Sequence, residues 1–581
     1  MQLPRKLSFL ESFTHSLTRA AFLVGIFSFI ASLLGMVRDR MLAGTFGAGA
    51  DLDTYYAAFR LPDFFYNTLL IGITSSAFLP VLTRYLHKPG KEKTGKGKEE
   101  EKPLAFPQEA KNFIDSLITF MFAVLFFSTL VLFFATPVAM NWIAPGFNLE
   151  QKTSTIMLTR IMLLSPIFLS FSGMMGNILN LKKFFFFYSL APIVYNLAMI
   201  LSIVFLVPRI GVQGLAWGIA LGALCHLSVQ LLPAKALGFE FSWRWEPNHP
   251  GIKKVFKIAV PRSIHLGVLQ FNLVITTLLA STLPAGSLAV FNFANNLQSV
   301  PLGLFGASYA IAAFPALSIM VAKKERKKFR DEFVKTMCQI LFFIIPLSAI
   351  LIILRAQVVR LILGSGKFDW EDTVLTLNVL GILAVSLFAQ SLNLLFIRAF
   401  FALQDTITPL KSGIIGLVVN TVIGALVVKN WNCFAPFIER QTECSGFKAP
   451  IIGLAFAFSV SQVASFIFLL VGLSKHLKGI SIGKIKLRLS KIALATLGMG
   501  AATQTAKWLF GEIIVKKWSL GETIFSFSTI FSVFSQIVFS GIIGIVVYLF
   551  ICKTLRCEEL TSLYEECPKI FGRKYCPTKK N

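Results

Sequence analysis

Four apolar stretches of the sequence carry polar or small side chains at spacings of three, four or seven residues, which places each set on one helical face. The sets are Gly25, Ser28, Ser32, Gly35 and Asp39; Asn67 and Thr74; Arg262, His265, Asn272 and Thr276; and Asn292, Asn295, Asn296, Ser299, Gly303 and Gly306. Small residues favour close helix packing. Polar groups inside a bilayer are costly unless paired or wetted, so the Asn cluster and Arg262 with His265 predict a hydrated cavity. Cationic groups at its rim favour an anionic or amphiphilic substrate.

The sequence offers little for enzyme chemistry. Asp51 and Asp53 have the spacing of a metal-binding glycosyltransferase pair, but a three-residue match carries little weight. The six His residues form no HExxH pattern, and there is no Gly-x4-Gly-Lys-Ser/Thr phosphate loop. We interpret His226 as a packed residue rather than a ligand. The expectation is a chain that is not an enzyme and needs no metal or cofactor.

The eight cysteines leave two questions open. Cys433 and Cys444 fall in a loop predicted to lie on the outer side of the membrane, where an oxidising compartment could join them. A disulfide and two free thiols are equally compatible with the sequence. Four more cysteines follow residue 551 without a C-x2-C pair, which disfavours a zinc site.

The amino-acid composition indicates that these residues lie in a lipid bilayer. Hydrophobic residues make up 55% of the 581 residues, charged residues only 15%, and the mean hydropathy is +0.70. Soluble domains have about 25% charged residues, so a soluble enzyme and a disordered chain are both excluded. The sequence predicts an all-α, polytopic membrane protein whose fourteen apolar stretches are each about long enough to span a bilayer. They are 18–37, 64–83, 113–136, 155–175, 186–208, 212–234, 254–282, 287–318, 333–354, 373–397, 407–428, 449–473, 487–510 and 527–552.

The net charge of +27 follows from membrane topology. If the N-terminus is cytoplasmic, 40 of the 56 Lys and Arg residues fall in cytoplasmic segments, as the positive-inside rule requires. Nucleic acid is therefore not needed to explain the charge. Both termini are expected in the cytoplasm.

Two halves of the chain resemble each other. GVQGLAWGIAL, beginning at residue 211, parallels PIIGLAFAFSV, beginning at residue 450, and lone Asn residues precede each block. A repeat of six helices is a parallel repeat, as in several transporters. We predict an N-terminal lobe over 1–234 with a mobile basic loop at 87–111, and a cytoplasmic linker at 235–252. The linker is followed by a C-terminal lobe over 253–475, two extra helices over 476–552 and a cytoplasmic Cys-containing tail over 553–581.

The sequence also resembles a known family. Five blocks are similar, in the same order, to blocks of the MurJ/MviN lipid II flippases of the MOP exporter superfamily. They are LLGMVRDRMLAGTFGAGADLDTYYAAFRLP (33–62), APIVYN (191–196), ANNLQSVPLGLFGASYAIAAFPALS (294–318), GSGKFDWEDT (364–373) and RAFFALQDTITPLK (398–411). The resemblance implies two six-helix lobes that carry a lipid-linked peptidoglycan precursor between leaflets. It also implies cationic residues around the diphosphate, and a groove in 476–552 for the polyprenyl tail.

The resemblance assigns substrate-binding roles and also reveals departures. Residues at matching charged positions are Arg38, Asp39, Asp53 and Arg60. Neutral residues replace charged family positions at Ser32, Tyr66, Asn67, Ile71 and Asn296. Three explanations stay open: Arg38, Arg60, Arg262 and Arg398 substitute for the missing arginines, the headgroup differs, or the activity is lost.

The leading prediction is a bacterial inner-membrane flippase for undecaprenyl-diphosphate-linked peptidoglycan precursor, working by alternating access. Its partners would be the lipid-linked precursor, membrane lipids and cell-wall synthesis proteins, with coupling to the membrane potential or to a monovalent cation. Alternatives are an exporter of another polyprenyl-linked saccharide, an exporter of a small cation or drug, a non-transporting scaffold for wall synthesis, and a membrane glycosyltransferase.

Overall fold

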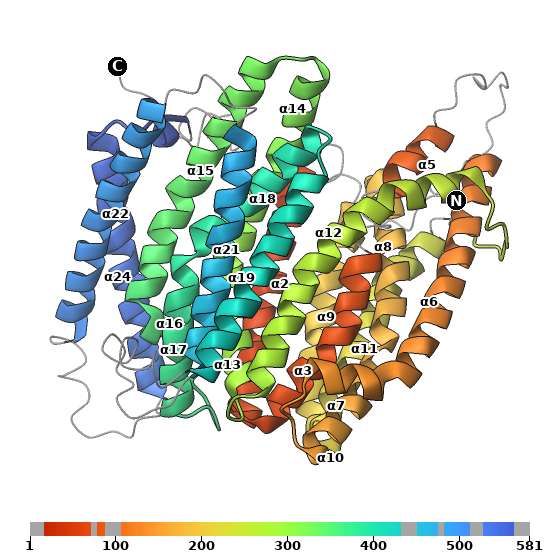
Figure 1. Cartoon of the computed structure of the whole chain (residues 1–581), viewed down its shortest axis with the longest axis horizontal. Coiled ribbons are helices and arrows are strands. Elements are labelled where there is room, and N and C mark those ends of the chain that lie inside the picture. Colours follow the sequence, from red (N-terminus) through yellow and green to blue (C-terminus); the bar gives the residue numbers. More distant parts are fainter. Residues whose placement is uncertain are drawn as a thin grey trace. The chain divides into compact units, whose positions relative to one another are not determined.

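The computed structural model describes residues 17–70, 78–86, 106–236, 238–430, 450–474, 482–511 and 527–562. Every regular element in these ranges is a helix (Figure 1), which confirms the predicted all-α fold. Nine helical segments among the described residues are long and apolar enough to cross a membrane, and a bent pair over 370–402 makes ten. Each of the fourteen predicted stretches overlaps at least one helix.

The chain divides into two compact units. Unit 1 contains residues 1–42 and 49–285, and unit 2 contains residues 43–48 and 286–581. The helices of unit 1 are most of α2 (Leu17–Phe46), α3 (Ala50–Phe65), η1 (Tyr66–Leu70), α5 (Leu79–Leu86), α6 (Gln108–Ile143), α7 (Leu149–Met162), α8 (Leu164–Leu181), α9 (Phe185–Phe205), α10 (Val207–Ile210), α11 (Gln213–Ala236) and α12 (Pro250–Ser281). Those of unit 2 are α13 (Ser287–Pro301), η3 (Leu302–Ala307), α14 (Ser308–Ala322), α15 (Arg326–Ile353), α16 (Arg355–Ile362), α17 (Trp370–Val385), α18 (Leu387–Ala402), α19 (Ile407–Lys429), α21 (Pro450–Ser474), α22 (Ile482–Phe510) and α24 (Phe527–Thr554).

Helix boundaries follow local sequence signals. Asn148 caps α7 by accepting a hydrogen bond from the Gln151 backbone N–H, and the Gln151 side chain accepts one from the Asn148 N–H in return. Proline within a helix removes a backbone donor and perturbs the hydrogen-bond ladder. Pro62 precedes the π-helical η1, and Pro301 directly precedes the π-helical η3. The second apolar stretch of each predicted half therefore contains the same kind of irregularity.

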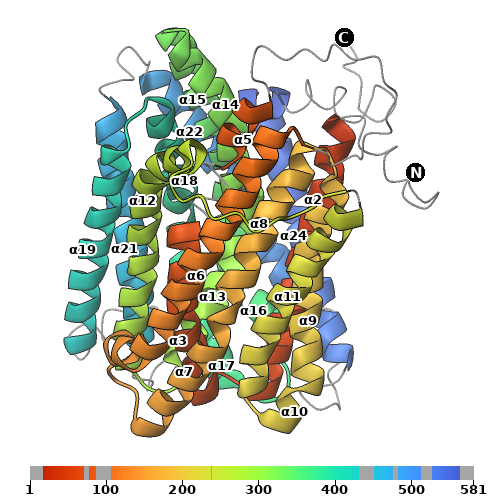
Figure 2. The same ribbon diagram turned by 90° about the vertical axis from the view of Figure 1, so that its right-hand side faces the viewer.

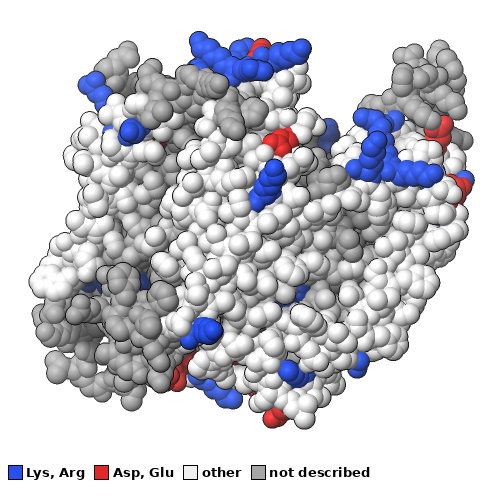
Figure 3. All heavy atoms as spheres, in the orientation of Figure 1, with Lys and Arg blue, Asp and Glu red and all other residues white. Residues whose placement is uncertain are grey.

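The apolar side chains point both inward and outward, as expected in a bilayer. In unit 1, Phe78 and Phe113 are buried in the core beside α6, while Phe127 and Phe134 of the same helix are 63% and 69% exposed. In unit 2, Phe550 of α24 is 66% exposed. On the face drawn in Figure 3, Lys and Arg lie mainly near the upper and lower edges, and most of the surface between them is uncharged. Such apolar outer surfaces are favourable only against lipid.

The end of α2 is held by a turn of unit 2. The Lys367 N–H donates to the Gly44 carbonyl over 2.9 Å, and the Ala48 N–H donates to Oδ2 of Asp372 over 2.8 Å. Gly366 has a φ of +54°, and a Cβ atom there would lie 2.2 Å from the Gly44 carbonyl oxygen. Only glycine fits this close backbone approach. These contacts, which we call the α2 clamp, explain why residues 43–48 group with unit 2.

Helix α12 packs against α3, η1 and α6, so its contacts assign it to unit 1. The predicted start of the second lobe, residue 253, falls near the beginning of this helix; the lobe boundaries and the six-helix repeat stay predictions. Linker 235–252 places Trp243 beside Phe122 and Trp245 beside Phe120. Most of loop 87–111, both Cys433 and Cys444, and the tail beyond 562 lie outside the described residues.

Candidate functional site

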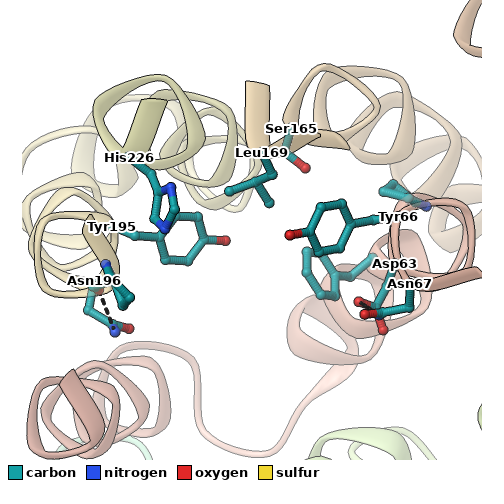
Figure 4. A pocket seen from close by; sticks show the side chains of 11 residues that line it. Asp63, Tyr66, Asn67, Ser165, Leu169, Tyr195, Asn196 and His226 are labelled. Carbon is teal, nitrogen blue, oxygen red and sulfur yellow. Dashed lines mark hydrogen bonds between the residues drawn. The ribbon is translucent and has the colours of Figure 1, made fainter. Parts of the chain in front are cut away.

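A pocket of about 280 Å³ lies within unit 1 (Figure 4). It is formed where α3 and η1 face α8, α9 and α11, and α11 packs closely against α9 and α8 (Figure 2). Its lining combines aromatic and apolar walls with polar groups: Phe59, Pro62, Asp63, Tyr66, Asn67, Ser165, Leu169, Pro192, Tyr195, Asn196 and His226. Polar groups converging on a concave site among apolar helices are typical of a binding pocket.

One wall of the pocket comes from α3 and η1. Asn67 donates a hydrogen bond from Nδ2 to Oδ1 of Asp63 over 2.6 Å. The two residues are four positions apart, so they share a helical face across the junction after Pro62. The Tyr66 hydroxyl points across the pocket toward the Tyr195 hydroxyl on the opposite wall (Figure 4).

The opposite wall comes from α9 and α11. The Ser172 hydroxyl lies 2.7 Å from Nδ1 of His226, and the Tyr195 ring packs edge-on against the imidazole at 6.5 Å between centroids. Asn196 donates from Nδ2 to the Pro192 carbonyl over 3.0 Å. This wall is therefore held in place by side-chain contacts, as a preorganised site requires.

Arg38 reaches the pocket through Asn196. Its Nη1 donates to Oδ1 of Asn196 over 3.3 Å, while Nε and Nη2 donate to Oδ1 of Asp39 over 3.1 and 2.8 Å. The neighbouring carboxylate thus fixes the guanidinium and balances its charge. Because three nitrogens are already hydrogen-bonded, an anion approaching Arg38 meets an oriented group rather than a mobile one.

Arg60 and Asp53 are buried on α3. Arg60 is 8% exposed, and its Nε donates to the Thr277 hydroxyl of α12 over 2.8 Å. Asp53 is 3% exposed in the first turn of α3, where the helix N-terminus favours negative charge. Arg60 therefore connects α3 to α12 inside unit 1.

Of the eleven predicted site residues, only Asn67 lines this pocket, and Arg38 contacts it through Asn196. Ser32 is exposed and donates to the Ser28 carbonyl of its own helix over 3.0 Å. The other predicted residues lie elsewhere in the two units: Asp39, Asp53, Arg60 and Asn272 in unit 1, and Asn296 and Arg398 in unit 2. Arg262 and His265 belong to α12, but their side chains lie outside the described part of the structure. The binding roles of all eleven stay proposals.

Sequence reasoning missed Asp63, Tyr66, Tyr195 and His226. Arg60, Asp63 and Asn67 follow one another at spacings of three and four, which is a helical face that the sequence could have revealed. Tyr195 and His226 gave no such signal, because they reach the pocket from helices distant in the sequence.

Unit 2 contains a second cavity, between α22 and α24. Its volume is about 540 Å³, and apart from one Thr its lining is apolar: Ala501, Ala502, Thr505, Ala506, Leu509, Phe510, Phe539 and Ile543. Helices α22 and α24 run side by side (Figure 1). An apolar groove of this kind suits a hydrocarbon chain.

Solved structures with this fold are transporters. A lipid II flippase MurJ in an inward closed conformation matches with a TM-score of 0.69 and 21% identity, covering 92% of this chain and 98% of that one. An inward-facing multidrug resistance MATE family transporter of the MOP superfamily matches with a TM-score of 0.59 and 14% identity, covering 78% of this chain and 96% of that one. These likenesses establish the fold, which is that of a multi-span helical membrane protein.

The sequence comparisons identify the family. The model of the family "Lipid II flippase MurJ" matches residues 42–528. A probable lipid II flippase MurJ of Vibrio cholerae is 29% identical over 472 residues, covering 80% of this chain and 84% of the relative. A lipid II flippase MurJ of Burkholderia cenocepacia is 25% identical over 470 residues, covering 79% and 84%. The chain belongs to the lipid II flippase MurJ family, which consists of transporters rather than enzymes.

Proposed function

We propose that this chain is a lipid II flippase of the bacterial inner membrane. It moves the undecaprenyl-diphosphate-linked peptidoglycan precursor from the inner to the outer leaflet by alternating access. The observation that carries the proposal is the family match over residues 42–528, which includes both described cavities almost entirely. Both termini are cytoplasmic in this proposal, and cell-wall synthesis proteins are partners.

Arg38 supplies guanidinium hydrogen-bond donors for the diphosphate. A diphosphate accepts charge-assisted hydrogen bonds most strongly from guanidinium groups. Asn196 and Asp39 hold the Arg38 guanidinium, so binding needs little reordering of this side chain. Arg60, Arg262 and Arg398 are the further cationic candidates in place of the neutral Ser32, Asn67 and Asn296.

The polyprenyl tail has a separate place in the proposal. The apolar groove between α22 and α24 offers hydrocarbon contacts without polar cost. The saccharide and peptide headgroup is the part that lipid excludes, so only the headgroup needs a polar path. Separate sites for a polar headgroup and an apolar tail are what an amphiphilic substrate requires.

Complementation tests the proposal. Bacteria depleted of their own lipid II flippase would express the wild-type chain, Arg38→Ala, or Arg209→Ala, which removes an exposed arginine of unit 1 outside the pocket. Outer-leaflet lipid II is the readout. A charge-assisted hydrogen bond contributes about 1.5–3 kcal/mol, so we expect Arg38→Ala to lower transport roughly 10- to 100-fold. We expect wild type and Arg209→Ala to rescue growth.

A different polyprenyl-linked saccharide is the second candidate cargo. The neutral residues Tyr66, Asn67 and Asn296, at positions where the family resemblance predicts charge, favour it. Failure of a well-expressed, membrane-inserted wild-type chain to restore outer-leaflet lipid II would refute the lipid II assignment and favour this cargo. Rescue by Arg38→Ala at the wild-type level would instead contradict the role of Arg38.

A further inference from the structure

Uncharged polar side chains form a hydrogen-bonded network inside unit 2, which we call the unit 2 amide network. Asn295 and Gln298 belong to α13, Gln390 belongs to α18, and Ser386 immediately precedes α18. Gln298 and Ser386 are each 1% exposed, and Gln390 is 8% exposed. Polar groups among membrane helices are expensive, and they commonly mark the path of a polar substrate.

The direction of each hydrogen bond in the network follows from a backbone carbonyl, which can only accept. The Ser386 hydroxyl donates to the Leu383 carbonyl over 2.9 Å, so its oxygen is left to accept. Gln390 therefore turns its NH2 group toward Ser386, and Nε2 donates to the Ser386 hydroxyl oxygen over 3.0 Å. The same NH2 group donates to Oε1 of Gln298 over 3.2 Å. The backbone thus determines which end of each amide faces which neighbour.

Ser459 of α21 leaves this direction unchanged. Its hydroxyl oxygen lies 3.2 Å from that of Ser386, and it donates to the Ile382 carbonyl over 3.2 Å. A hydroxyl has a single hydrogen, and both the Leu383 carbonyl and Ser459 compete for that of Ser386. Whichever of them takes it, none remains for Gln390, so Gln390 must be the donor.

The network ends at Asn295 and fixes the orientation of this amide. Because Gln298 accepts through Oε1, its Nε2 faces the other way and donates to Oδ1 of Asn295 over 3.0 Å. The network uses the Asn295 oxygen, so Nδ2 is the group that Asn295 presents outside it. Asn295 is half-buried and shares a helical face with Ser299, four residues further on, which is exposed. An oriented NH2 group therefore lies beside an accessible polar surface of a membrane helix.

We propose that Asn295 donates from Nδ2 to an uncharged oxygen of the lipid-linked headgroup, a hydroxyl or a carbonyl, and that Gln298 is the positioning residue that fixes this donor. The inference rests on the proposed function and adds a contact to the headgroup beyond the diphosphate. Charged oxygens gain most from guanidinium groups such as that of Arg38, whereas a neutral amide suits neutral oxygens. An Asn side chain without the network could turn its oxygen toward the substrate. Gln298 prevents this rotation, which lowers the cost of binding.

The test is transport of lipid II by full-length variants in proteoliposomes, with KM and the maximal rate measured separately. Losing one neutral hydrogen bond that forms on binding and persists during transport raises KM alone. We therefore expect Asn295→Ala and Gln298→Met each to raise KM roughly 3- to 10-fold at an unchanged maximal rate. The matched control is Gln339→Met, the same change at a buried Gln of α15 outside the network. We expect its KM to equal that of the wild type.

A double variant separates positioning from packing. If Gln298 acts only through Asn295, Gln298→Met adds nothing to KM in an Asn295→Ala background, whereas an independent packing effect adds to it. Gln390→Met serves if Gln298→Met does not fold. It leaves the Gln298 and Asn295 amides free to reverse together, and equal populations of the two orientations raise KM about twofold.

Binding to the chain in detergent, measured with lipid II and with undecaprenyl diphosphate, locates the acceptor oxygen. We expect Asn295→Ala and Gln298→Met to weaken the binding of lipid II only. Equal weakening of both ligands places the contact on the diphosphate and overturns the proposal.

Three kinetic results also overturn the proposal: an unchanged KM in Gln298→Met, an equal rise in Gln339→Met, or additive effects in the double variant. In each of these cases a wild-type chain that transports lipid II leaves the proposed function standing. A folded, inserted wild-type chain that transports none refutes the proposed function and this inference with it.

Discussion

The α2 clamp depends on a glycine that no other residue can replace without strain, so Gly366→Ala is a sharp perturbation. Its φ of +54° costs an L-residue about 1–2 kcal/mol. The new Cβ would lie 2.2 Å from the Gly44 carbonyl oxygen, so the two backbones must separate. Separation breaks the 2.9 Å hydrogen bond from the Lys367 N–H to Gly44, which contributes about 1 kcal/mol. We expect a total loss of about 2–3 kcal/mol.

Thermal unfolding of the purified chain in detergent measures this loss as a lowered melting temperature. The matched control is Gly541→Ala in α24, where an added Cβ meets no atom within 4 Å and where alanine favours the helix. Asp372→Asn is an independent perturbation of the same clamp, because it weakens the acceptor for the Ala48 N–H. If Gly366→Ala melts at the temperature of Gly541→Ala, the clamp does not hold the end of α2 and the reasoning is wrong.

Two further substitutions test packing in unit 2 and unit 1. The buried Tyr548 hydroxyl donates to the Phe342 carbonyl over 2.7 Å, so Tyr548→Phe should cost about 1–2 kcal/mol; an unchanged melting temperature would contradict this contact. Burial lowers the pKa of His249, whose Nδ1 accepts the Gly251 N–H at the start of α12. The unfolded chain therefore binds this proton more readily, and stability should fall as the pH drops below about 6.5. His249→Asn keeps a capping acceptor and should show a shallower pH dependence, and an identical profile would exclude His249 as the cause.

Hydropathy and charge placement predict the fold well, because a membrane-spanning helix is encoded locally. About twenty consecutive apolar residues suffice to mark each one, and each predicted stretch overlaps a helix. The same reasoning could not assign α12 to a unit. Its grouping with α3 and α6 depends on contacts between residues far apart in the sequence.

The candidate site was only partly predictable. Asn67 lies on a polar helical face, which a sequence reveals directly, whereas Arg38 is named by the family resemblance. His226 is the one His of its helix and Tyr195 follows the apolar Ile193 and Val194, so neither differs in sequence from a packed residue. Their place across the pocket from Asp63 follows from the packing of α9 and α11 and is visible only in the structure (Figure 4).

Lipid II translocation by the purified chain in proteoliposomes tests the central claim most directly. Labelled lipid II in the inner leaflet would be followed as it becomes accessible to an external probe. The account predicts exposure well above that of empty liposomes, reduced roughly 10- to 100-fold in Arg38→Ala and unchanged in Arg209→Ala. Exposure no faster than in empty liposomes, from a chain shown to be folded and inserted, would contradict it.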